Sequence, residues 1–131
     1  METLIAEYGS VVYDRKVDCL HLTCKGFLSY EELVELLERA YKLILRHQLS
    51  KCLINLQKIE VYPEGATEYL QQVWYLNMIA GGIQHVAYVV PDDVFGSMAM
   101  KEVHLEELPG LVRQYFTNEE SAKAWLLSLS R

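Results

Sequence analysis

The sequence predicts an α/β domain in which a single-layer mixed, mostly parallel β-sheet of about five strands is covered by about four helices. First, short apolar runs alternate with helical patterns, which is typical of parallel strands joined by crossover helices. Second, segment 85–90 is apolar on both faces, as a buried parallel strand must be. Third, a strand predicted over 111–116 runs into a capped amphipathic helix. The inward-facing positions of this helix are Ala122, Trp125, Leu126 and Leu129.

The start of the chain predicts a β-hairpin. Two β-rich runs, 11–13 and 19–24, flank a polar turn that contains Asp14 and Asp18. Gly26 is expected to end the second strand. Because the strands of a hairpin are antiparallel, this opening makes the sheet mixed.

Residues 28–33 carry a strong helix start. Ser29 and Glu32 are spaced as a capping box, and Leu28 and Leu33 as a hydrophobic staple. A wide apolar stripe follows, so this helix is expected to pack on the sheet. The stripe consists of Tyr30, Leu33, Val34, Leu37, Ala40, Tyr41 and Ile44.

The middle of the chain predicts one more strand and two more helices. The apolar run 52–56 is short and follows a long helix, which favours a buried strand. Pro63 is expected to open the second helix, and Gly81 and Gly82 are expected to end it. A third, weakly patterned helix is expected from about residue 94 to residue 105.

Composition bounds the class of protein. A chain of 131 residues with 51% hydrophobic and 23% charged residues fits one globular domain spanning 1–131. The net charge of −6 and the scattering of the twelve Lys and Arg residues argue against nucleic acid as a partner. The N-terminus lacks the positive start of a signal peptide, and no apolar run approaches the ~18 residues of a membrane span. We therefore expect a cytoplasmic protein.

The chain contains three cysteines, Cys19, Cys24 and Cys52, all in strand-like stretches. A thiol in such a place behaves as a small apolar group. Cys19 and Cys24 lie five residues apart on one strand, so they face opposite sides of the sheet and could not easily pair. We interpret the three as structural thiols.

Spacing argues against the common catalytic and metal sites. The four histidines, His21, His47, His85 and His104, lack the spacing of metal ligands. Ser97 follows Gly96 but has no second glycine of a nucleophile elbow. Adjacent Glu119 and Glu120 are expected to form a solvated face. We therefore expect no cofactor and no enzymatic activity.

Taken together, several segments resemble a STAS-type domain (STAS/SpoIIAA-like) over nearly the whole chain. They are the hairpin, the capped helix, residues 54–56 before a helix near Pro63, the strand 85–90 and the closing stretch 116–126. The resemblance implies the fold of anti-sigma-factor antagonists and a regulatory role through protein contacts. A branch of small bacterial proteins also resembles this family, and some are linked by name to CRAL-TRIO lipid carriers.

The sequence departs from this family at the regulatory segment. STAS antagonists present a phosphorylatable hydroxyl at a helix N-terminus, where negative charge is tolerated. Here Glu64 and Gly65 occupy about that place, and the nearest hydroxyl, on Thr67, comes roughly a turn too late. The usual phospho-acceptor serine is therefore absent. Glu64 either mimics a phosphate or is a first-turn glutamate that favours the helix dipole.

The second helix is more apolar than the fold requires. At 100° per residue, its sheet-facing stripe should consist of Ala66, Tyr69, Leu70, Val73, Leu76 and Ala80. A second apolar set falls largely outside this stripe. It consists of Trp74, Tyr75, Met78 and Ile79, with Phe95 and Met98 expected nearby on the third helix. These residue types are frequent at interfaces and in adaptable pockets. Either the second and third helices simply cover each other, or they form a functional apolar surface.

Two functional hypotheses follow from this apolar set. In the first, the protein is a regulatory or interaction domain, and Trp74, Tyr75 and Met78 contact a second copy in a homodimer or another protein. In the second, it is a small carrier whose second and third helices part to admit an apolar ligand such as a lipid chain. We favour the first because the family resemblance implies binding rather than chemistry.

Overall fold

The computed structural model describes residues 4–61, 63–93 and 110–129. These residues form a six-stranded sheet whose strands follow one another in chain order. The strands are β1 (Leu4–Ala6), β2 (Gly9–Asp14), β3 (Cys19–Phe27), β4 (Lys51–Val61), β5 (His85–Val89) and β6 (Val112–Phe116). The pairs from β3 to β6 are parallel, and the two pairs before them are antiparallel. The predicted α/β class and mixed, mostly parallel sheet are confirmed.

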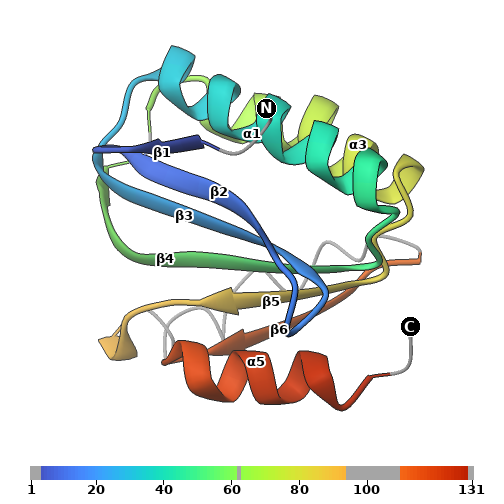
Figure 1. Cartoon of the computed structure of the whole chain (residues 1–131). Coiled ribbons are helices and arrows are strands. Elements are labelled where there is room, and N and C mark those ends of the chain that lie inside the picture. The colour runs from blue at the N-terminus through green and yellow to red at the C-terminus, as the bar shows by residue number, and fades with distance from the viewer. Residues whose placement is uncertain (1–3, 62, 94–109, 130–131) are drawn as a thin grey trace.

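Helices cover both faces of this sheet (Figure 1). The helical elements are α1 (Tyr30–His47), the continuous run α2 (Ala66–Tyr69), η1 (Leu70–Trp74) and α3 (Tyr75–Ala80), and α5 (Glu119–Leu127). The first crossover, through α1, and the second, through 66–80, lie on the same face because successive parallel crossovers share one hand. Helix α5 follows the last strand and covers the opposite face. We call these the cavity face and the α5 face.

The predicted hairpin is confirmed as β2 and β3, but β1 was not predicted. A three-residue strand is too short to show a period, which explains why six strands replace the expected five. The turn from β1 to β2 depends on Gly9, because a Cβ there would lie 2.1 Å from the carbonyl oxygen of Thr23. Strand β3 continues past Gly26 to Phe27, with a shift in its register against β4 at this point.

Helix α1 begins as predicted. Ser29 Oγ accepts a hydrogen bond from the backbone N–H of Glu32 at 3.1 Å, and Glu32 Oε1 accepts one from the N–H of Ser29 at 2.8 Å. Leu28 and Leu33 are both buried. The buried stripe lies slightly to one side of the predicted one, since Tyr30 is exposed and Leu36 and Leu43 are buried, along with Leu37, Ala40 and Ile44. Helix α1 contacts both the strands and the run 66–80. Its apolar face therefore packs partly on the sheet and partly on the neighbouring helical run.

The second helix begins at Ala66, three residues later than predicted from Pro63. Gly65 precedes it in the left-handed region, at φ 88°, and caps it without a side chain. The helix cannot extend backwards through this conformation. Glu64 therefore lies in the turn before the helix, which corrects the expectation of a first-turn glutamate.

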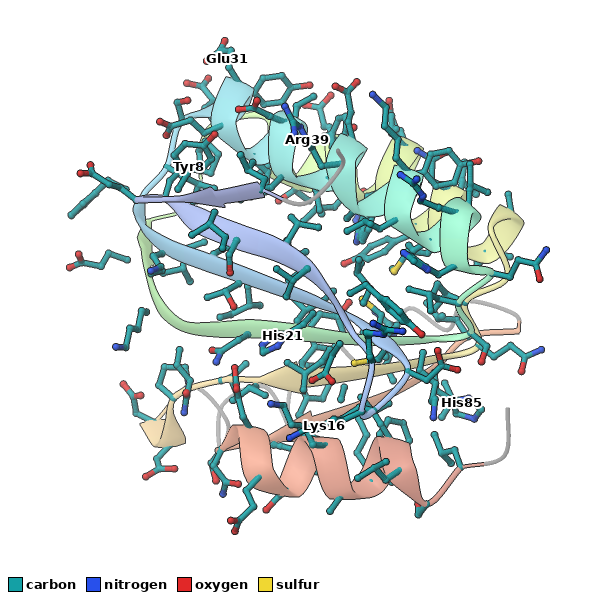
Figure 2. All side chains as sticks on the ribbon, in the orientation of Figure 1. Tyr8, Lys16, His21, Glu31, Arg39 and His85 are labelled. Atoms are coloured by element: carbon teal, nitrogen blue, oxygen red, sulfur yellow. The ribbon has the colours of Figure 1, made fainter. Side chains whose placement is uncertain are left out.

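Each face of the sheet has its own hydrophobic core. The larger core lies on the cavity face and includes Leu22, Ile54 and Tyr88. The smaller core, on the α5 face, includes Leu53 and Leu126. In Figure 2, Tyr8, Glu31 and Arg39 lie beside α1, and His85 lies near the end of α5.

The predicted last helix is confirmed as α5, in which Ala122 and Leu126 are buried. The third helix expected from 94 to 105 lies outside the described residues, as do Phe95, Met98 and His104. Within the described ranges, no helix is both long and apolar enough to cross a membrane.

Candidate functional site

The site starts from a break in helical periodicity at η1. Here the backbone N–H of Tyr75 donates to the carbonyl of Leu70, five residues back, which is the hydrogen bond of a π-helix. An α-helix would bond four residues back. One extra residue is thereby accommodated, and every later side chain is rotated by about 100° around the helix axis.

This rotation reverses the predicted faces of the second helix. Trp74 and Met78 are buried, with 1% and 0% of their surface exposed, whereas Val73 and Leu76 are 37% and 59% exposed. The inward residues Ala66, Leu70, Trp74 and Met78 are spaced four apart. The predicted stripe was wrong in its second half because it assumed 3.6 residues per turn throughout.

An apolar cavity of about 260 Å³ lies under this segment, between α1, the run 66–75 and the sheet. In the described part of the chain, the side chains that line it are all apolar or aromatic except that of Thr67. They are Leu22, Cys24, Leu33, Leu37, Ile54, Leu56, Ala66, Thr67, Leu70, Trp74, Tyr75, Tyr88 and Tyr115. Thr67 is exposed, so the cavity reaches the surface at the first turn of α2.

Two strands contribute to the cavity from near their carboxyl ends. Tyr88 and Tyr115, which both line it, are the next-to-last residues of β5 and β6.

The two tyrosines form one wall of the cavity. They are register partners, and their rings stack with centroids 5.1 Å apart at 17°. Burial raises the pKa of Tyr88 well above its ordinary value, and it raises the pKa of Tyr115 to about 12. Both hydroxyls are therefore neutral at physiological pH.

The structure brings only part of the predicted binding set to the cavity. Trp74 and Tyr75 line it. Met78 is buried in the core beside it, and Ile79 is half-buried against the same core. Thr67, from the predicted regulatory segment, is at the rim.

The other two residues of the regulatory segment line a separate, more open groove of about 370 Å³. Glu64 and Gly65 meet there with Glu68 and a T-shaped pair formed by Tyr30 and Tyr69, whose centroids are 6.0 Å apart. The three segment residues thus do not converge on one site.

The α5 face carries a polar cluster that the sequence did not predict. Glu119 Oε2 lies 2.9 Å from His21 Nε2 and accepts a hydrogen bond from Asn55 Nδ2 at 2.7 Å. Lys123 Nζ lies 3.9 Å from Glu119 Oε1 and 3.7 Å from Asp14 Oδ2. The expectation of a solvated Glu119 was wrong, because two of its partners, His21 and Asn55, come from distant parts of the sequence.

The electrostatics of Glu119 follow from these contacts. Partial burial disfavours its charged form, but the hydrogen bond from Asn55 and the contacts with His21 outweigh burial and lower the pKa of Glu119. The carboxylate is thus stabilised at the first turn of α5, where negative charge also favours the helix dipole.

The three cysteines are free and buried. Cys19 and Cys24 belong to the cores of opposite faces, so the prediction that they could not pair is confirmed. Burial raises the pKa of the Cys24 thiol, which lines the cavity, to about 12. A thiol of this kind stays protonated and is a poor nucleophile.

Sequence reasoning missed Tyr88 and Tyr115, since both lie in runs that were interpreted only as strands. Their shared wall depends on the register between β5 and β6, which no motif encodes. No protein-family model, curated protein or solved structure matches this chain significantly. Function must therefore be inferred from the geometry of the chain itself.

Proposed function

We propose that this protein is a non-enzymatic domain that binds a small apolar molecule in the cavity beneath η1. The supporting observation is the cavity of about 260 Å³ with a lining that is apolar or aromatic except at Thr67. An engineered apolar cavity of about 150 Å³ stays dry and binds benzene, and ligand pockets begin at roughly 300 Å³. This cavity falls between the two, so its occupant has about the size of two fused rings and is shorter than a long lipid chain.

Two further features support binding rather than chemistry. Among the described residues, the lining contains no carboxylate, histidine or lysine that could act as an acid or a base, and the thiol of Cys24 stays protonated. The roof is a π-helical turn, an element that occurs frequently at functional sites. Transfer of an apolar molecule into such a space is favoured by about 25 cal/mol per Å² of surface removed from water.

The test is binding of fluorobenzene, followed by ligand-observed fluorine NMR. Leu56 lines the cavity, and Leu56→Trp would fill part of it with a larger ring system. Ile59→Trp is the matched control, because Ile59 is also a half-buried residue of β4 but is not part of the lining. We expect saturable binding to the wild type and to Ile59→Trp, and its loss in Leu56→Trp.

Two results would contradict the proposal. One is a wild-type protein that does not bind fluorobenzene. The other is a folded Leu56→Trp variant that binds it as well as the wild type does, since the probe would then be bound elsewhere.

A second candidate function is the interaction domain that the STAS resemblance implies. Its support is the exposure of Val73 and Leu76, which are three residues apart and share one helix face turned to solvent. Trp74 and Met78 are buried, so a contact would use Val73 and Leu76 instead. Leu76→Glu should then shift a homodimer to monomer in native mass spectrometry, and a wild-type protein that is monomeric at every concentration would exclude self-association.

A further inference from the structure

The open groove beside the first turn of α2 combines aromatic walls with negative charge. It has a volume of about 370 Å³ and shares no lining residue with the apolar cavity. In the described part of the chain, its lining includes two tyrosines and two glutamates but no lysine, arginine or histidine. The groove therefore differs from the cavity in the kind of molecule that it suits.

The two tyrosine rings of the groove are nearly perpendicular to each other. Tyr30 belongs to α1 and Tyr69 to α2, and their ring centroids are 6.0 Å apart at an angle of 86°. Gly65 packs closely on the first ring, because a Cβ on it would lie 3.2 Å from two ring atoms of Tyr30. The face of an aromatic ring is partially negative and attracts a cation within about 6 Å of its centroid. Two such rings in one groove favour a positively charged occupant.

The carboxylates of the groove act in the same direction. Glu64 and Glu68 are exposed, and within residues 4–61, 63–93 and 110–129 neither forms an ion pair. Burial, together with the negative charge of Glu38, raises the pKa of Tyr69, which shows that a third carboxylate lies near the groove. Like charges in one place repel each other, so a cation that enters the groove is favoured electrostatically.

The aromatic walls decide which kind of cation fits. A Ca²⁺ or Mg²⁺ ion is held by a shell of oxygen ligands, whereas aromatic rings recognise quaternary ammonium groups. Val73, which is 37% exposed, also lines the groove and offers apolar contact to methyl groups. A ligand that also carried a phosphate or carboxylate would be repelled by the two glutamates. The matching occupant is a compact monocation with a methylated ammonium group.

We propose that this groove is a second binding site and takes a small organic cation with a quaternary ammonium group. The methyl groups of the cation contact the rings of Tyr30 and Tyr69. The carboxylates of Glu64 and Glu68 balance its charge. This site goes beyond the proposed function and does not depend on it, because the apolar cavity is lined by other residues.

The experiment compares choline with 3,3-dimethylbutan-1-ol, which has the same shape but a neutral carbon in place of the charged nitrogen. Ligand-observed proton NMR measures the binding of both probes to the whole chain. We expect saturable binding of choline and about tenfold weaker binding of the neutral alcohol, since two exposed cation–π contacts together supply about this factor. Binding of choline should also weaken as the salt concentration rises.

Two pairs of variants locate the site. Tyr30 is 39% exposed, so its replacement should leave the fold intact. Tyr30→Leu should weaken choline binding roughly two- to fivefold, whereas Tyr30→Phe, which keeps the ring, should retain it. Glu68→Gln should also weaken binding. Its matched control is Glu120→Gln, which makes the same change in net charge on α5, across the sheet from the groove, and should have no effect.

Three results would overturn the proposal. The first is a wild-type protein that does not bind choline. The second is equal binding of choline and the neutral alcohol, since the charge would then not be recognised. The third is an equal effect of Glu68→Gln and Glu120→Gln, which would indicate attraction by net charge alone. Fluorobenzene binding by the same sample tests the apolar cavity separately, so the failure of one site is distinguishable from the failure of the other.

Discussion

The two faces of the sheet are covered in different ways. Among the described residues, the core of the cavity face contains 23 buried hydrophobic residues, and that of the α5 face contains seven. The larger cover consists of two helical segments and encloses a cavity, whereas the smaller cover is one nine-residue helix. The difference teaches that a large apolar core can hold its helices in place even with a cavity between them and the sheet. The small core of the α5 face is supplemented by specific polar contacts.

Those polar contacts lie at both ends of α5. At its start, Glu119 is bound by His21 and Asn55. At its end, Lys51 Nζ donates to the carbonyl of Leu126 at 3.1 Å, although only 5% of Lys51 is exposed. A cation at a helix C-terminus and an anion at its N-terminus both complement the helix dipole. Helix α5 is therefore positioned by charges at its ends as well as by its small core.

The largest expected effect tests the reversed face of the second helix. Trp74→Ala should lower the free energy of unfolding by about 3–5 kcal/mol, because it removes a buried aromatic side chain. Leu76→Ala, two residues along the same helix, should change it by less than about 0.5 kcal/mol because Leu76 is exposed. Urea unfolding of both variants measures the difference. A greater loss for Leu76→Ala would mean that the helix keeps 3.6 residues per turn.

An intermediate effect tests whether the two faces are independent. Leu126→Ala should destabilise the fold by about 2–5 kcal/mol, because Leu126 is fully buried on the α5 face. It should leave the affinity for fluorobenzene unchanged, since the sheet separates this residue from the cavity. Weaker binding in the folded variant would show that the faces are coupled through the strands.

The smallest effect depends on pH. The pKa of Glu119 is lowered in the folded protein, so its contribution to stability is complete above the ordinary value of 4.5 and is lost as the pH falls through the lowered pKa. Glu119→Gln should therefore be less stable than the wild type at neutral pH, and the difference should shrink in acid. Urea unfolding at several pH values measures this.

The matched control for this variant is Glu120→Gln, which alters the exposed carboxylate one residue further along α5. The prediction is contradicted if the difference in stability between the wild type and Glu119→Gln is the same at neutral and acidic pH. The contacts with His21 and Asn55 would then not stabilise the charged form of Glu119.

The sequence was sufficient wherever a local signal decides the structure. The capping box of Ser29 and Glu32, the hairpin turn around Asp14 and the inward positions of α5 all follow from spacing along the chain. It was insufficient where distant segments decide. The link between His21 and Glu119 spans 98 residues, and the cavity wall of Tyr88 and Tyr115 depends on strand register.

The π-turn is an intermediate case. Sequence spacing correctly singled out Trp74 and Met78 as unusual, but it placed them outside the sheet-facing stripe. A four-residue spacing of Ala66, Leu70, Trp74 and Met78 was present in the sequence and could have indicated a wider turn. Such a spacing is ambiguous on its own, because an α-helix also tolerates single steps of four.

The π-turn also has a consequence for how this chain compares with its evolutionary relatives. Residues 71–73 are all exposed, and removal of one of them would place Ala66, Leu70, Trp74 and Met78 at steps of four, three and four, the spacing of a regular α-helix. The run 66–80 is thus equivalent to an ordinary helix with a single inserted residue. A related chain without that insertion would align with a one-residue gap between Leu70 and Trp74 and would present the same side chains to the sheet.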